Sequence, residues 1–203
     1  MWPILLCSIL ALSIAIERWR ELNRVERETD RAFKAIQKAL IQRELAQAKR
    51  LARQSPSPLG RMAEASIRWY GRPRQEIREI LEEIGSQESV PLARYVPLLG
   101  TIAHLAPLLG LLGTVTGLIR CFQVIQEKAT LAHGVNPGDL AGGIWEALIT
   151  TVFGLCVAIP CYAGYNYLVH RTQTIVHQLE TKASQLTALL SPEGSPVEEV
   201  GAL

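Results

Sequence analysis

Three long stretches of the chain are almost free of charged side chains, and they alternate with stretches that are rich in charge. The apolar stretches cover residues 1–16, 96–119 and 147–169. Two of them exceed the ~18 residues that a membrane-spanning helix needs, and the first falls just short of that length. The pattern predicts an all-α integral membrane protein with three transmembrane helices, and it excludes an ordinary soluble enzyme.

The first apolar stretch has the flanks of a retained membrane anchor. Trp2 and Trp19 suit the two membrane–water interfaces, and no basic residue precedes the stretch. A cleaved signal peptide would instead carry positive charge before its apolar part. The stretch is short, about 24 Å as a helix. This length fits either insertion without tilt or a start codon assigned slightly downstream of the true one, and both alternatives for Met1 stay open.

The distribution of charge predicts the orientation. Between Glu17 and Arg94 lie 17 of the 21 basic residues and 12 of the 19 acidic ones. Basic flanks stay on the cytoplasmic side, so we expect the N-terminus outside, the C-terminus inside and long helical extensions in the cytoplasm. The expected segments are a transmembrane helix (1–17), a cytoplasmic helical segment (18–95), a second transmembrane helix (96–119), a periplasmic loop (120–140), a third transmembrane helix (141–170), and a cytoplasmic helix with a flexible tail (171–203).

Proline and glycine mark the expected breaks in the charged stretch. Residues 17–54 contain neither and alternate in charge, which predicts one long helix continuing out of the membrane. The Ser-Pro repeat of residues 55–58 ends it. The remaining expected elements are a helix over residues 59–70, a helix from Pro73 to about Ser86, a helix start at Asn136 and Pro137, and a helix over residues 171–190 followed by a frayed tail.

The second span has one face made of small residues. At 100° per residue these fall within an arc of about 140°, and the leucines occupy the rest. Small residues let helices approach closely, so this face predicts helix packing, with Thr114 adding a hydroxyl and Pro107 a kink. The candidate packing and kink residues of the second and third spans are Pro107, Gly110, Gly113, Gly117, Gly154 and Pro160.

The third span has its polar residues along one stripe. Glu146, Thr150 and Thr151 share an arc of about 140° with the small residues of this helix. An ionisable group in a span costs ~2.5–3.5 kcal/mol and is by default a candidate functional residue. Glu146 could also be an interfacial carboxylate that reaches water, and the threonines could simply bond their own i−4 carbonyls. The combined stripe favours a polar pathway.

Other chemistry has little support. The four cysteines lack metal or disulfide spacing, and no nucleotide or metal motif is present, so we expect no cofactor and no metal. The basic residues are interleaved with acidic ones, which favours a solvated helical face over a nucleic-acid interface. His104, on the leucine-rich side of the second span, is expected to be a buried neutral side chain and not a proton relay.

Two segments resemble the ExbB/TolQ/MotA family of ion-driven motor proteins. They are APLLGLLGTVTGLI (106–119) and GGIWEALITTVFGLCVAIPCYAGYNYLVHR (142–171). The three-span layout with a long segment between spans one and two is similar to the ExbB and TolQ branch, whereas MotA-type stators carry four spans. The likeness covers roughly residues 90–171, and the remainder agrees in layout only.

The resemblance implies a motor of the bacterial inner membrane. Such motors contain a pentamer of this kind of chain around two copies of a single-span partner, ExbD or TolR, which carries a membrane aspartate. Together they would energise a TonB- or TolA-type transducer. In the family, the glutamate and threonines corresponding to Glu146, Thr151 and Thr114 line the pore, and Pro107 matches a family proline. Thr150 belongs to the same stripe, so these four polar residues form the candidate proton pathway.

Two other functions compete with this interpretation. A passive membrane scaffold without ion conduction would need neither Glu146 nor aligned threonines. A solute transporter would show inverted halves or broken spans, which are not visible. Within the family, the sequence leaves open the ExbB or TolQ role, the transported substrate, proton or sodium as the ion, and the number of subunits.

Overall fold

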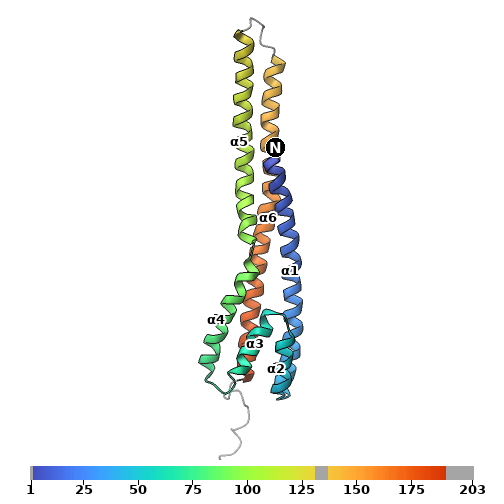
Figure 1. Ribbon diagram of the computed structural model, residues 1–203, viewed down its shortest axis with the longest axis vertical. Coiled ribbons are helices and arrows are strands. Elements are labelled where there is room, and N and C mark those ends of the chain that lie inside the picture. The colour runs from blue at the N-terminus through green and yellow to red at the C-terminus, as the bar shows by residue number, and fades with distance from the viewer. Residues whose placement is uncertain (1, 131–136, 191–203) are drawn as a thin grey trace, which may run out of the picture. The chain divides into compact units, whose positions relative to one another are not determined.

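The structure, a computed structural model, describes residues 2–130 and 137–190, and all elements in these ranges are α-helices (Figure 1). They form two compact units, each described by itself. Residues 1–18 and 95–169 make up the apolar unit, and residues 19–94 and 170–203 the charged unit. The helices are α1 (Trp2–Ile41), α2 (Leu45–Gln54), α3 (Pro58–Arg68), α4 (Arg74–Ala93), α5 (Val96–Thr130) and α6 (Pro137–Leu190).

Within the described ranges, three helices are long and apolar enough to cross a membrane. Their qualifying segments are Trp2–Ile41, Val96–Glu127 and Leu140–Leu190, in agreement with the three spans predicted from the sequence. Large apolar side chains of these segments point outward, where a soluble protein would bury them. On α5 the exposed ones include Leu98, Leu105, Leu108, Leu111, Leu112 and Val115. An outward leucine face is what lipid requires.

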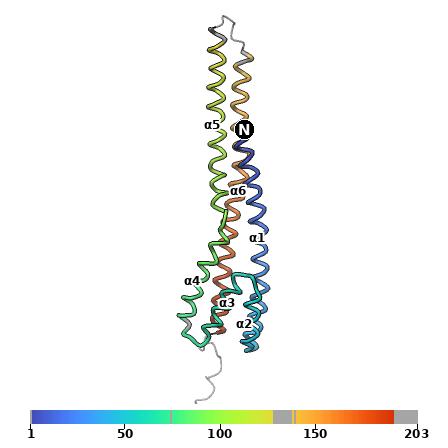
Figure 2. The backbone as a smooth tube through the Cα atoms, in the orientation of Figure 1, coloured from blue at the N-terminus to red at the C-terminus, as the bar shows by residue number. Residues whose placement is uncertain are grey.

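In the apolar unit, α5 and the first part of α6 lie side by side (Figure 2). The first turns of α1 add Ile4, Ala11 and Ile14 to the buried side chains of this unit. Where α1 leaves the unit, the Arg18 guanidinium stacks over the ring of Tyr95, 5.4 Å from its centroid. Tyr95 has a left-handed backbone, with φ of 64°, and begins the turn that starts α5. This contact ties α1 to the base of α5.

In the charged unit, α1 and α6 bury positions spaced three and four residues apart, as in a coiled coil. On α1 these are Leu22, Val25, Thr29, Ala32, Ile36 and Ala39, and on α6 they are Thr172, Ile175, Leu179, Ala183, Leu186 and Leu190. The ion pairs Arg171–Glu26 and Lys182–Asp30 join the two helices beside these buried positions. Helices α2, α3 and α4 pack in succession, and Arg61 of α3 pairs with Glu88 of α4.

Three expected boundaries differ from the structure. The single helix expected over residues 17–54 is wrong, because α1 ends at Ile41 and α2 begins at Leu45. Arg43 there adopts φ of 57°, and the Glu44 amide donates to the Ala39 carbonyl at 2.9 Å while the Arg43 amide donates to the Leu40 carbonyl at 3.0 Å. This pair of bonds is a Schellman helix end, which usually carries glycine where Arg43 stands.

The other two differences are extensions of helices. Residues 120–130, expected in the loop, belong to α5, since no glycine or proline interrupts this segment. Helix α4 continues past Ser86 to Ala93, with Pro91 in its last turn. Helix α6 begins at Pro137, while the expected cap at Asn136 and the frayed tail lie outside the described residues.

Candidate ion pathway

Helices α5 and α6 approach each other most closely along two rows of small residues. A Cβ atom added to Gly154 would lie 2.8 Å from the Ala106 carbonyl oxygen and 3.0 Å from the Gly110 Cα. One added to Gly110 would lie 3.1 Å from the Thr150 carbonyl oxygen. These neighbours are backbone atoms, which no rotamer change can move. Gly110 and Gly154 therefore set the spacing of the two helices.

Above this crossing, the glycines of α5 make room for side chains of α6. A Cβ atom on Gly113 would lie 2.5 Å from the Thr150 hydroxyl oxygen, and one on Gly117 would lie 2.9 Å from the Ala147 Cβ. Towards the base of α5, Gly100 lies against the ring of Tyr165, with 2.8 Å from its added Cβ to Cε2. The small face expected on the second span thus meets the expected stripe of the third span within one chain.

The threonine hydroxyls of the candidate pathway donate to backbone carbonyls. Thr151 of α6 donates to the Gly110 carbonyl of α5 at 3.1 Å, across the contact between the two helices, which we call the glycine seam. Thr150 donates to the Ala147 carbonyl of its own helix at 2.6 Å and lies 3.4 Å from the Gly110 carbonyl. Thr114 donates to the Leu111 carbonyl at 2.7 Å. Each hydroxyl keeps lone pairs that can accept a hydrogen bond, so the row can serve as an acceptor wall for water or for a protonated carboxyl.

Glu146 lies one helical turn before Thr150 on the same face of α6. Its side chain is exposed, and no basic residue in the described part of the chain forms an ion pair with it. The neighbouring Trp145 is 69% exposed, so the beginning of α6 presents both a carboxylate and a large aromatic side chain outward. Glu146 is therefore available to water or to another helix, in agreement with both alternatives that the sequence left open.

Two prolines lie inside the spans. Pro107 interrupts the amide ladder of α5, and Pro160 that of α6, while both helices continue through them. Each proline leaves the carbonyl four residues earlier without its usual amide donor. Those carbonyls belong to Ala103 and Cys156.

His104 differs from expectation, because it lies on the exposed side of α5. Its Nδ1 is 2.7 Å from the Gly100 carbonyl oxygen, and its ring is edge-on to Tyr162 at 6.0 Å. Among the described residues, no group of three or more His, Cys, Asp and Glu could hold a metal ion.

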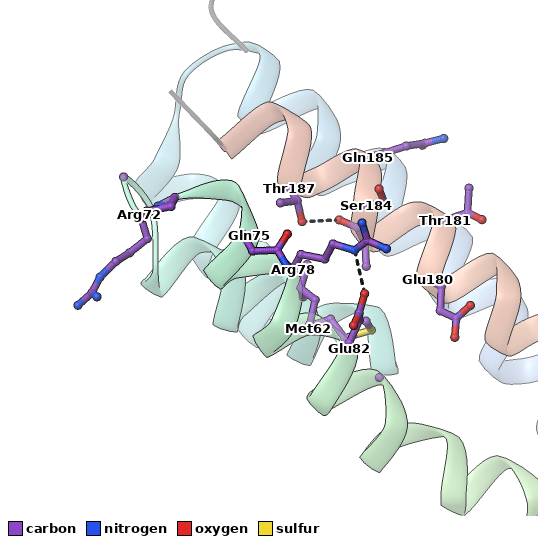
Figure 3. A pocket seen from close by; sticks show the side chains of 15 residues that line it. Met62, Arg72, Gln75, Arg78, Glu82, Glu180, Thr181, Ser184, Gln185 and Thr187 are labelled. Carbon is purple, nitrogen blue, oxygen red and sulfur yellow. Dashed lines mark hydrogen bonds and ion pairs between the residues drawn. The ribbon is translucent and has the colours of Figure 1, made fainter. Parts of the chain in front are cut away.

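A groove of the described structure lies elsewhere, in the charged unit (Figure 3). It has a volume of about 1560 Å³ and is lined by α4 and the last turns of α6, with Met62 of α3 beneath them. Its charged groups are balanced, and Arg78 pairs with Glu82 at 2.8 Å. None of the candidate pathway residues contributes to it, and sequence periodicity gave no signal for it.

Sequence reasoning also missed the ion pairs that join helices. Arg61–Glu88 and Arg171–Glu26 connect residues 27 and 145 positions apart. Alternating charge predicts solvated helices but does not predict which residues pair with each other. The Tyr165 contact with Gly100 could have been found, since Tyr165 shares the stripe of Thr151 on a helical wheel.

The apolar helices, their outward leucines and the glycine seam define a helical integral membrane protein. Residues 54–181 match the MotA/TolQ/ExbB proton channel family, and the chain belongs to that family. Its relatives support the ExbB/TolQ branch.

Three relatives illustrate the similarity. An ExbB-like biopolymer transport protein of Synechocystis sp. is 36% identical over 83% of this chain and 66% of its own length. The Tol-Pal system protein TolQ of Pseudomonas aeruginosa is 36% identical over 52% of this chain and 44% of its own length. The biopolymer transport protein ExbB of Aquifex aeolicus is 39% identical over 40% of this chain and 53% of its own length.

Proposed function

We propose that this chain is a subunit of a motor in the bacterial inner membrane that is driven by the proton-motive force. Together with an ExbD- or TolR-type single-span partner, it would energise TonB- or Tol-dependent transport across the envelope. Membership in a proton channel family supports the ion-conducting role, and similarity to ExbB and TolQ proteins supports the biopolymer-transport role.

The observation that carries the proposal is the hydroxyl-lined seam. Thr151 and Thr150 of α6 face α5 across Gly110, and the exposed Glu146 lies one turn away from them. Their hydroxyls have acceptor capacity left, so they can hold water or a protonated carboxyl. One proton crossing ~100 mV releases ~2.3 kcal/mol, so a few protons can supply useful mechanical work.

The seam by itself makes an incomplete pathway. Inward from Glu146, the stripe of α6 holds hydroxyls and small residues but no further acid or base before its end. An aspartate on a partner helix could take up a proton, lose its charge and pass the apolar zone at lower energy. Copies of this chain in a closed ring, a pentamer by analogy with the family, would surround such a helix.

Reconstitution of the protein into liposomes, with and without the single-span partner, tests the proposal. We expect little proton flux from the chain alone and a clear increase with the partner. Glu146→Ala and Thr151→Val should abolish the increase, while Thr151→Ser, which keeps the hydroxyl, should restore most of it. Ile159→Leu is the matched control, since Ile159 is 68% exposed on the opposite side of α6.

Three outcomes would contradict the proposal. Robust flux without any partner would refute the shared pathway. Full activity of Glu146→Ala would make Glu146 an interfacial carboxylate. If the chain conducts no ions with any single-span partner, the passive scaffold is the better description.

A further inference from the structure

Helix α1 carries a row of arginines directly after its apolar turns. Arg20, Arg24, Arg27 and Arg31 are spaced four, three and four residues apart, which places them within an arc of about 60°. All four are exposed. The buried positions of α1, such as Leu22 and Thr29, lie on the opposite side of the helix. The row is therefore an outward cationic face.

Two of the acidic residues of this part of α1 are engaged with another helix. Glu26 and Asp30 turn towards α6, where they pair with Arg171 and Lys182. Within the outward row, Arg24 binds Glu28 at 2.9 Å. In the described ranges, no carboxylate forms an ion pair with the other three arginines. The fold thus pairs two of the acids with basic residues of α6, while the outward row keeps four arginines beside the flanking Glu21 and Glu28.

An aromatic side chain completes the surface. Trp19, 52% exposed, lies beside Arg20, Asn23 and Arg24 around a shallow depression of about 370 Å³. The depression continues past Arg27 to Arg31, and its one carboxylate, Glu28, is the partner of Arg24. An indole ring next to basic side chains, at the end of an apolar helix, suits the headgroup region of a bilayer. The depression offers arginine donors for an anion and an aromatic surface for the adjoining glycerol and acyl carbons.

We propose that this depression binds the headgroup of an anionic phospholipid in the adjacent leaflet. The proposal rests on the membrane insertion of α1 that the proposed function requires. Along the helix, Arg20 is about 6 Å and Arg27 about 16 Å beyond Ile16. The headgroup layer is about 5–7 Å thick on each side, and long basic side chains on a helix reach back towards its N-terminus.

This geometry divides the row into two parts. Arg20 lies within the headgroup layer, and Arg24, about 12 Å beyond Ile16, reaches it through its side chain. Arg27 lines the same depression directly after them and adds its charge. Arg31, Lys34 and Lys38 continue the same face but lie too far along the helix. The site is therefore local to the first three arginines.

Fluorescence quenching of Trp19 tests the proposal. A variant with Trp2, Trp69 and Trp145 replaced by Phe keeps Trp19 as the one tryptophan of the chain. It is placed in phosphatidylcholine nanodiscs in which a minor share of the lipid is brominated phosphatidylglycerol or, in parallel, brominated phosphatidylcholine. A basic residue near the surface enriches anionic lipid by about fivefold, so we expect quenching by the anionic lipid to exceed that by the neutral one about twofold or more.

Two triple variants of equal charge locate the site. Arg20→Gln/Arg24→Gln/Arg27→Gln should bring the quenching ratio to about one, and Arg31→Gln/Lys34→Gln/Lys38→Gln should leave it unchanged. Equal quenching of Trp19 by both lipids in the single-tryptophan variant that keeps all its basic residues would refute the proposal. Equal loss in both triple variants would also refute it, since the attraction would then be general. Proton flux measured on the same nanodisc-competent variants in liposomes reports separately on the proposed motor function.

Discussion

Replacing Gly154 by alanine should weaken the packing of α5 against α6. The new methyl carbon would lie 2.8 Å from the Ala106 carbonyl oxygen, whereas an unstrained C–H···O contact needs about 3.3 Å. The helices would have to move apart by about 0.5 Å locally. The Thr151 hydroxyl bond to the Gly110 carbonyl, 3.1 Å now, would be lost with that movement.

The expected loss of stability follows from these contacts. Overpacking a close contact costs about 1–3 kcal/mol, and an interhelical hydrogen bond in a membrane contributes about 0.6 kcal/mol. The helix propensity of alanine returns up to about 1 kcal/mol. Gly154→Ala should therefore lower the free energy of unfolding by about 1–2 kcal/mol.

Gly164→Ala is the matched control on the same helix. Its added Cβ would lie 3.9 Å from the nearest neighbour, Leu99 Cδ2, which is an ordinary van der Waals contact. We expect this variant to be as stable as the parent or up to about 1 kcal/mol more stable. Reversible unfolding by SDS in mixed micelles, followed by circular dichroism, measures both. If Gly154→Ala is no less stable than Gly164→Ala, the close approach of the backbones at Gly110 is wrong.

Three further predictions concern the rest of the chain. Arg53 donates a hydrogen bond to Glu64 and lowers the pKa of that carboxyl below its usual 4.5, so the stabilisation by this pair is present at neutral pH and is lost as the pH falls through the lowered pKa. Arg53→Gln should raise the Glu64 pKa towards 4.5 in a carbon-13 NMR titration. Arg43→Gly should raise the free energy of unfolding by up to about 1 kcal/mol, because glycine adopts the left-handed conformation without strain. Single cysteines at Gly134 and Ser55 should label from opposite sides of the membrane, with position 134 outside.

Each of these predictions has its own control. Arg50→Gln removes a neighbouring charge that does not bond Glu64 and should leave the titration unchanged. Lys49→Gly places glycine inside α2 and should lower the free energy of unfolding by about 1 kcal/mol. A stability loss in Arg43→Gly equal to that of Lys49→Gly would contradict the Schellman assignment. Labelling of both cysteines from one side would rule out three spans with the proposed orientation.

Helix type and span number could be predicted because they depend on patterns along one dimension. The stretch 96–119 has no charged side chain, and the charged stretch before it ends at Arg94. These two facts already define a helix of membrane length. The contact of Gly113 with Thr150 was implied as well, since each lies on the small or polar arc of its own helix. Periodicity assigns every residue of a helix to a face, and faces made of small residues tend to pack against each other.

The break at Arg43 could not be predicted in the same way. Its residues favour helix, and the glycine that normally marks a Schellman end is absent. Arg43 nevertheless adopts the left-handed conformation, and α2 packs against α3 after the turn, which is tertiary information. The pairing of Arg171 with Glu26 depends likewise on the register of two distant helices. Hydrogen bonding of the Thr151 hydroxyl to α5 required the distance between the two backbones.

The glycine seam also determines how this protein can change during evolution. At Gly113 and Gly117 the obstructing atoms belong to the side chains of Thr150 and Ala147, so a larger residue on one helix can be balanced by a glycine on the other. At Gly154 the obstruction is the backbone of α5, which every amino acid shares. No second substitution can remove it. The upper pairs can therefore exchange sizes over time, whereas position 154 should remain glycine in any descendant that keeps this helix crossing.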